Sequence, residues 1–332
     1  MLTPLAAIAS QGEEISCGTI FNAMVSTYSE GAYLTVPGIR SGGTVFYRYS
    51  PPTAGKETFV LLHGLTADSS DWADVAEILK SKGYGVVIRD SLATGKTFKA
   101  NASSGYRVEE VTLADQVAAD ASLVQQLGLK NVHIVGHSHG GAVSQELAAM
   151  PGLDVKGVHL VTPYLKRVDF NIVDGAMQDS PFAIGWNMSR TWMDAIAPGV
   201  FRSMTETNVN TFGASALVQQ YRTLIKARVV KAGGTISEAE LTSQANAIYS
   251  EVKDVLHRDF IATPSPVPEN IPYQLIYGTN DRINPFAHMN EFQNSLESSG
   301  RKVKSVTING GSHYLPTEEP EKIAGALIQG LP

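Results

Sequence analysis

The chain is poor in several features that would point to particular classes of protein. Cys17 is the only cysteine among 332 residues, so an intrachain disulfide and a cysteine-based metal site are both excluded. No stretch approaches the roughly 18 consecutive apolar residues of a transmembrane helix. Lysine and arginine form no cluster, and the formal net charge of −6 argues against a nucleic-acid-binding surface. Composition therefore predicts a soluble globular protein without a nucleic-acid partner.

The N-terminus leaves the compartment open. Residues 2–9 are apolar and end in an Ala-x-Ala pattern, but no basic region precedes them and the run is short for an export signal. The cytoplasm is the default location, whereas a trimmed export signal at this end would place the protein in the periplasm or outside the cell. The oligomeric state is not encoded in any pattern that we find.

The most informative stretch of the sequence joins an apolar run to a helix-like pattern. Residues 132–135 predict a buried strand, and residues 142–148 carry apolar side chains at helical spacing. Between them lies a G-x-S-x-G motif, Gly136-His137-Ser138-His139-Gly140. Glycines two residues before and after a serine let strand and helix approach closely, and hold the serine in a strained, projecting turn. We therefore predict that Ser138 is a nucleophile.

Strand and helix patterns alternate along most of the chain. A hairpin is expected at 33–36 and 44–49, and further strands at 58–62, 86–88, 132–135, 158–161, 273–277 and 303–308. Helices are expected at 71–82, 114–127, 142–150, 286–300 and 318–329. This alternation predicts an α/β fold with a mostly parallel central sheet and helices on both faces.

Two segments interrupt the alternation. Residues 91–106 are expected to form an exposed loop; they contain Gly95-Lys96-Thr97, but the earlier glycine of a phosphate-binding loop is replaced by Asp90, so a nucleotide site is excluded. Residues 164–262 carry helical stretches and no clear strand. We predict a core domain of residues 1–163 and 263–332, with residues 164–262 inserted as a helical domain.

A serine nucleophile needs a base, usually an imidazole held by a carboxylate. His313 follows the last expected strand, and Asp281 follows the strand before it. Since the carboxyl ends of parallel strands meet at one edge of the sheet, Ser138, Asp281 and His313 are predicted to form a catalytic triad in that chain order. Taken singly, Asp281 is equally well explained as a turn residue and His313 as a loop histidine.

A tetrahedral intermediate also needs hydrogen-bond donors for its oxyanion. One backbone N–H is expected from His139, which follows the nucleophile. The other is expected from Leu65, in the loop that follows the strand at 58–62.

Four motifs together resemble the α/β-hydrolase superfamily, of the serine esterase and lipase type. They are His63-Gly64, the turn around Ser138, Gly278-x-x-Asp281-x-x-x-Pro285 and Gly311-Ser312-His313. The resemblance implies an α/β-hydrolase fold whose inserted domain is a helical cap over the triad. One departure is the segment Asp90–Thr97, where many relatives have an Asp-x-x-Gly-x-Gly-x-Ser loop.

The expected reaction is hydrolysis of a small-molecule carboxylic ester, without a metal or organic cofactor. The substrate pocket is predicted to include His63, Trp186, Met188 and Trp192, which suits an apolar acyl group, although the apolar residues of the insert are equally well explained as its own core. Two alternatives remain open. One is a hydrolase that cleaves an amide, lactone or carbon–carbon bond with the same triad, and the other is a non-catalytic ligand-binding protein on a hydrolase scaffold.

Overall fold

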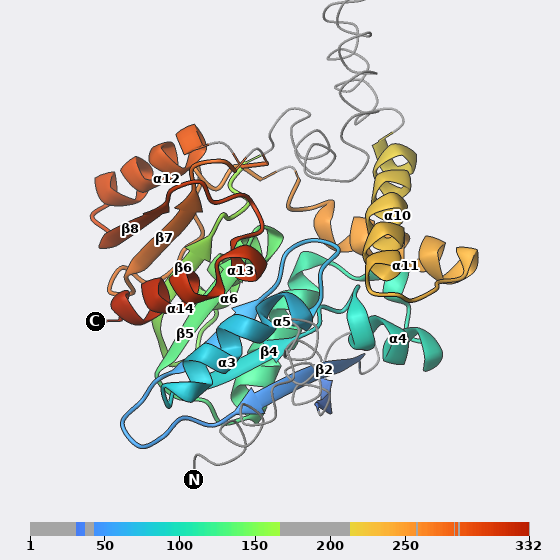
Figure 1. Cartoon of the computed structure of the whole chain (residues 1–332), viewed down its shortest axis with the longest axis horizontal. Helices are drawn as coiled ribbons and strands as arrows, with labels where there is room; N and C mark the ends of the chain where they lie inside the picture. Colours follow the sequence, from blue (N-terminus) through green and yellow to red (C-terminus); the bar gives the residue numbers. More distant parts are fainter. Residues whose placement is uncertain are drawn as a thin grey trace, which may run out of the picture.

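One eight-stranded sheet organises the chain (Figure 1). The computed structural model describes residues 31–36, 43–166, 213–256, 258–281, 283–284 and 286–331. The strand order is β1-β2-β4-β3-β5-β6-β7-β8; β1 and β2 pair antiparallel to their neighbours, and all pairs from β4 to β8 are parallel. The strands are β1 (Ala32–Val36), β2 (Gly43–Ser50), β3 (Thr58–Leu62), β4 (Gly85–Arg89), β5 (Val132–His137), β6 (Val155–Val161), β7 (Tyr273–Gly278) and β8 (Val303–Ile308).

Helices cover both faces of the sheet (Figure 1). On one face lie α3 (Ala73–Ser81) and α14 (Pro320–Gln329), and on the other α5 (Leu113–Gln126), α6 (His139–Ala148) and α12 (Phe286–Ser298). The structure also has η2 (Ser69–Trp72), α4 (Gly95–Ser103), η3 (Val108–Glu110), α10 (Gly213–Lys231), α11 (Glu238–Val252) and α13 (Leu315–Glu318). The predicted α/β architecture is confirmed.

The central strands supply both apolar cores because their side chains alternate between the two faces. On β3, Val60 and Leu62 belong to the cluster beneath α5 and α6, whereas Phe59 and Leu61 belong to the cluster beneath α3 and α14. Every residue of β3 is buried, which accounts for its uninterrupted apolar sequence. The loops that follow the parallel strands meet at one edge of this packed sheet.

The expectation of an exposed loop at 91–106 is wrong, because this segment contains α4. Its polar residues are buried as hydrogen-bond partners of β2: the N–H of Phe46 donates to Oγ1 of Thr97, and the N–H of Thr44 donates to Oδ1 of Asn101, both at 2.8 Å. A helix that buries polar atoms against a strand carries little apolar periodicity, so its sequence looks like that of a loop.

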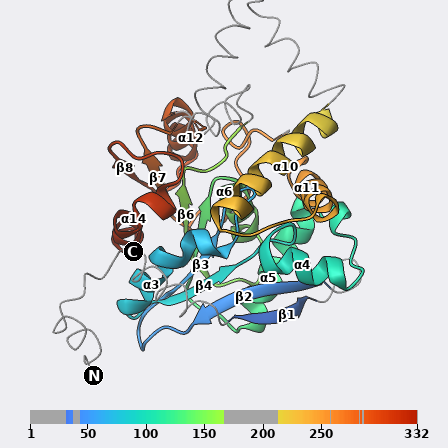
Figure 2. The same ribbon diagram turned by 45° about the vertical axis from the view of Figure 1, so that its right-hand side comes forward.

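Helices α10 and α11 lie between β6 and β7 in the sequence and pack side by side (Figure 2). Residues 167–212, which precede them, lie outside the described residues. The division into a core of residues 1–163 and 263–332 and an insert of residues 164–262 therefore stays a prediction. No helix in the ranges that the structure describes combines the length and the apolar character needed to cross a membrane.

A hydrogen-bonded pair of histidines lies inside the sheet. His159 Nδ1–H donates to Oε1 of Gln274 at 2.6 Å, which leaves its Nε2 to accept from Nδ1–H of His133 at 2.9 Å. Both imidazoles are buried, and burial lowers the pKa of each below its ordinary value. Both are therefore neutral in the folded protein at pH 7.

We predict that acid destabilises the fold in part through this pair. The unfolded chain takes up protons at the ordinary histidine pKa of about 6.5, and the folded chain does not, so the free energy of unfolding falls as the pH drops below that value. Each such histidine contributes up to about 1.4 kcal/mol per pH unit. Urea unfolding between pH 7.5 and 5 should show a shallower slope for His133→Gln/His159→Gln than for the wild type. Equal slopes would contradict neutral burial of the pair.

Candidate active site

Ser138 occupies the sharp turn between β5 and α6, with φ 53° and ψ −119°. A positive φ costs a non-glycine residue about 1–3 kcal/mol, so the surrounding contacts must enforce it. Two of those contacts require glycine. A Cβ on Gly136 would collide with the backbone of Gly140, and a Cβ on Gly140 would collide with the carbonyl groups of Leu62 and His63. The motif is thus explained by close approach of β3, β5 and α6.

His313 and Asp281 are in contact at the same edge of the sheet. His313 Nδ1 and Oδ2 of Asp281 are 2.9 Å apart, and both side chains are almost entirely shielded from solvent. The other carboxylate oxygen, Oδ1, accepts from the N–H groups of Ile283 and Asn284, each at 2.8 Å. Asp281 is therefore fixed by its own turn, and its hydrogen bond with Nδ1 orients the imidazole of His313.

The backbone of His313 is tied to the turn that carries Ser138. The carbonyl of His313 accepts from Nε2–H of His137 at 2.8 Å and from Oγ1–H of Thr162 at 3.1 Å. The rings of His137 and His313 lie 4.9 Å apart between centroids. Burial lowers the pKa of His137 well below its usual value, so it remains a neutral donor. The residue before Ser138 thus sets the position of the predicted base.

The loop after β3 lies against the serine. A Cβ added to Gly64 would come within 3.2 Å of the Cβ of Ser138, and Thr66 next to Leu65 has a φ of 59°. His139 is the first residue of α6, where amide groups have no acceptor inside the helix. The N–H groups predicted to hold an oxyanion, those of Leu65 and His139, therefore belong to two segments next to Ser138.

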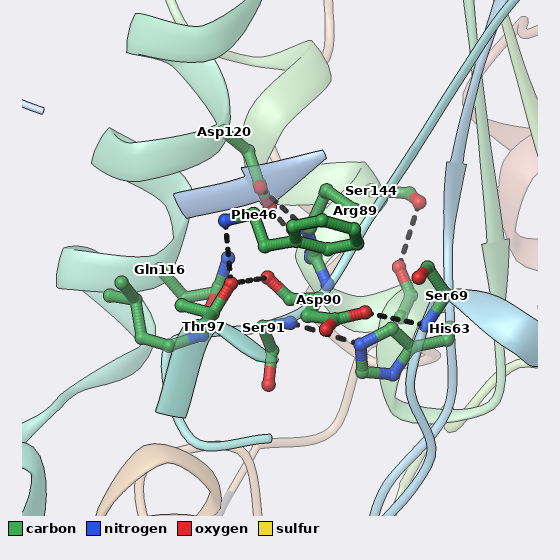
Figure 3. Close-up of polar contacts among 12 residues, drawn as sticks. Phe46, His63, Ser69, Arg89, Asp90, Ser91, Thr97, Gln116, Asp120 and Ser144 are labelled. Atoms are coloured by element: carbon green, nitrogen blue, oxygen red, sulfur yellow. Dashed lines mark hydrogen bonds and ion pairs between the residues drawn. The ribbon is translucent and has the colours of Figure 1, made fainter. Parts of the chain in front are cut away.

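His63, predicted as a residue of the substrate pocket, anchors this loop (Figure 3). Its Nδ1–H donates to the carbonyl of Gly64 at 2.8 Å, and its Nε2 accepts from the N–H of Ser91 at 3.0 Å and lies 3.3 Å from the hydroxyl of Thr94. Burial lowers the pKa of His63, which keeps the ring in this neutral form. The side chain connects the loop after β3 to the loop after β4.

Asp90, at the departure from the family pattern, fixes the start of α4. One carboxylate oxygen accepts from the N–H of Ser69 at 2.9 Å (Figure 3). The other accepts from the N–H of Lys96 at 2.6 Å. Gly95 has a φ of 57°, and a Cβ there would collide with the Asp90 carboxylate. The Gly95-Lys96-Thr97 sequence is explained by this helix start rather than by a phosphate.

Buried charged residues that lie beside Leu65 and His139 were missed in the sequence analysis. Arg89 forms a bidentate ion pair with Asp120, with both bonds at 2.7 Å (Figure 3), and both side chains are buried. Glu251 of α11 is also buried, 3% exposed. The sequence does contain one signal for the burial of Glu251. This residue lies one turn after Ile248, on the helix face that also buries Leu241 and Ala245.

Three of the predicted pocket residues, Trp186, Met188 and Trp192, lie outside the described residues. In the part of the chain that the structure does describe, no three histidine, cysteine or acidic side chains gather as a metal site would require.

Comparisons with known proteins point to one family. A sequence model described as the alpha/beta hydrolase family matches residues 59–326. The chain is 25% identical to a non-heme haloperoxidase of Rhodococcus erythropolis over 80% of this chain and 89% of that protein. It is 34% identical to lipase 1 of Psychrobacter immobilis over 37% of this chain, but spans only 36% of that protein's length. A thermophilic esterase from Thermogutta terrifontis has a similar fold, with a TM-score of 0.57 and 16% identity over 91% of this chain and 97% of that one.

The close approach at Gly140 generates a stability prediction. Gly140→Ala should lower the free energy of unfolding by about 1–3 kcal/mol, because its Cβ meets backbone carbonyls that cannot move without shifting β3. The control is Gly325→Ala in α14, where a Cβ meets nothing within 4 Å and a helical alanine should stabilise by about 0.5–1 kcal/mol. Urea unfolding of both variants measures the difference. A neutral Gly140→Ala would contradict the proposed packing of the turn.

Proposed function

The chain belongs to the α/β hydrolase family, and within that family we propose that it is a serine hydrolase that cleaves carboxylic esters. The observation that carries this proposal is the strained Ser138 at the same sheet edge as the hydrogen-bonded pair of His313 and Asp281. The order of the three residues in the chain is also the one expected of this fold.

In the proposed reaction, the hydroxyl of Ser138 attacks the ester carbonyl while Nε2 of His313 takes its proton. Asp281 holds the tautomer of His313 and stabilises the imidazolium that forms. The tetrahedral oxyanion accepts from the N–H groups of Leu65 and His139. The proton then passes from His313 to the leaving alcohol, and an acyl-enzyme remains on Ser138. Water, deprotonated by His313, attacks this ester and regenerates the serine. No step requires a metal or an organic cofactor.

We also propose that residues 164–262 form a cap over this site. Two contacts of the described part support this role. Arg228 of α10 forms an ion pair with Asp71 of η2, just after the loop of Leu65. Ile248 and Glu251 of α11 line a cavity together with Leu65 and His139. The substrate that we propose is a small-molecule ester whose acyl group lies beneath this cap, and an apolar acyl group remains a prediction from Trp186, Met188 and Trp192.

A different scissile bond remains the first alternative, since the same triad can cleave an amide, a lactone or a carbon–carbon bond. Rates on an ester, an amide and a diketone of matched shape distinguish these reactions, and the proposal expects the ester to react fastest. A ligand-binding protein on this scaffold would hydrolyse none of them. Because one relative is named a non-heme haloperoxidase, oxidation of bromide by hydrogen peroxide is a contrasting assay that the proposal expects to be slower than ester hydrolysis.

The nucleophile is tested with p-nitrophenyl esters of two to sixteen carbons. Ser138→Ala should lower kcat by at least about 10⁴-fold because no acyl-enzyme can form, and circular dichroism should show an unchanged fold. The neighbouring Ser144→Ala is the matched control: its hydroxyl donates to the carbonyl of Gly140 at 2.7 Å inside α6, so its loss should leave most activity. Turnover by Ser138→Ala at the wild-type rate would overturn the proposal.

The role of Asp281 gives a separate prediction. Asp281→Asn keeps the size of the side chain but favours the wrong tautomer of His313, so kcat should fall by about 10³–10⁴-fold with KM changed much less. Steady-state kinetics on the same esters measures both constants. A loss confined to KM would show that Asp281 serves in binding rather than in orienting the base.

A further inference from the structure

A small cavity is lined in part by the two segments that are proposed to hold the oxyanion. Its lining includes Leu65 and His139, together with the polar side chains of Arg89, Ser91 and Glu251. Its volume is about 10 Å³, which holds at most one water molecule and no part of an organic substrate. Because Glu251 is only 3% exposed, we infer that it acts on the site through its neighbours rather than by touching the substrate.

The carboxyl of Glu251 has few partners for a buried acid. Its Oε2 accepts from the hydroxyl of Ser91 at 3.4 Å, a long hydrogen bond, and its Oε1 lies 3.8 Å from Nδ1 of His139. Among the described residues, His139 Nε2 and Arg89 Nη1 are buried without a hydrogen-bond partner. The group thus sits in a polar surrounding that does not fully solvate a negative charge.

The charges around Glu251 do not balance its ionised form. Arg89 of β4 is already paired through two hydrogen bonds with Asp120 of α5. His139 is neutral, because burial lowers its pKa to about 3, and His63 is neutral for the same reason. Burial in this surrounding raises the pKa of Glu251 to about 7. Above neutral pH, Glu251 becomes an uncompensated buried carboxylate beside the backbone donors of Leu65 and His139.

We propose that Glu251 is a positioning residue that links α11 to the oxyanion-binding segments and supports ester hydrolysis only in its protonated, neutral form. The argument rests on the proposed function, because it concerns stabilisation of the same oxyanion. As a neutral acid, Glu251 can donate to a neighbour and adds no negative charge. As a carboxylate, it opposes the negative charge that develops on the substrate oxygen. One buried negative charge near the oxyanion lowers the rate of ester hydrolysis by about tenfold.

The test compares the pH dependence of kcat and KM in wild type and Glu251→Gln between pH 5.5 and 9, on one p-nitrophenyl ester. Glutamine keeps the shape of the protonated acid and cannot ionise. At pH 6 the two proteins should have kcat values within twofold. At pH 8.5 the kcat of Glu251→Gln should exceed that of wild type by about tenfold, with KM unchanged within twofold. The matched control is Glu240→Gln on the same helix, whose carboxylate pairs with Lys99 near the surface and should leave the wild-type profile unchanged.

A second measurement reports on Glu251 without enzyme activity. Because its folded pKa is raised above the ordinary value, the folded chain binds the proton more tightly, and its contribution to stability is lost as the pH rises to about 7. The buried histidines make the free energy of unfolding rise with pH over the same range, and ionisation of Glu251 opposes that rise. The free energy of unfolding of Glu251→Gln, measured in urea, should therefore rise more steeply with pH between 5 and 7 than that of wild type.

Superimposable pH profiles of kcat for wild type and Glu251→Gln would overturn the inference. An equal loss of activity in Glu251→Gln at every pH would also overturn it, as would the same change of the pH profile in Glu240→Gln. The proposed function would survive each of these results, because wild type would still hydrolyse the ester. If wild type hydrolyses no ester, the proposed function fails and the inference falls with it.

Discussion

The conformation of Ser138 is the constraint on which the site depends. Its positive φ is unfavourable for a serine, and it persists because β5 is paired on both sides and α6 begins immediately after it. The helix can begin there only because Gly136 and Gly140 let three backbone segments touch. The packing of the two apolar cores offsets the free energy of this strain. The same packing therefore keeps the sheet rigid and holds the hydroxyl of Ser138 in its projecting position.

Backbone atoms, rather than side chains alone, connect the parts of the site. The carbonyl of His313 is held by donors from β5 and from the end of β6, and the loop after β3 is held by His63 to the loop after β4. The two histidines that make these connections, His63 and His137, are buried and neutral, so each can donate a hydrogen bond from one ring nitrogen. Neutral burial is therefore a condition for the geometry of the site and also a source of acid sensitivity.

Much of this arrangement is predictable from the sequence, for identifiable reasons. A buried parallel strand is a continuous apolar run. A serine between two suitably spaced glycines indicates a sharp turn when it stands between such a strand and a helix pattern, so the sheet and the turn at Ser138 follow from the sequence. The positions of Asp281 and His313 follow because each comes just after a strand. Helix α4 was missed because it buries Thr97 and Asn101 as polar partners of β2. Glu251 was missed because its partners, Ser91 and His139, are more than a hundred residues away in the chain.

The central claim is that Ser138 forms a covalent acyl-enzyme, and trapping that adduct tests it most directly. The protein is treated with a fluorophosphonate, digested and mapped by mass spectrometry, with Ser138→Ala treated in parallel. The account predicts one phosphonylated peptide, modified at Ser138, and an unlabelled variant. Equal labelling of the variant, or modification at another residue, would contradict it.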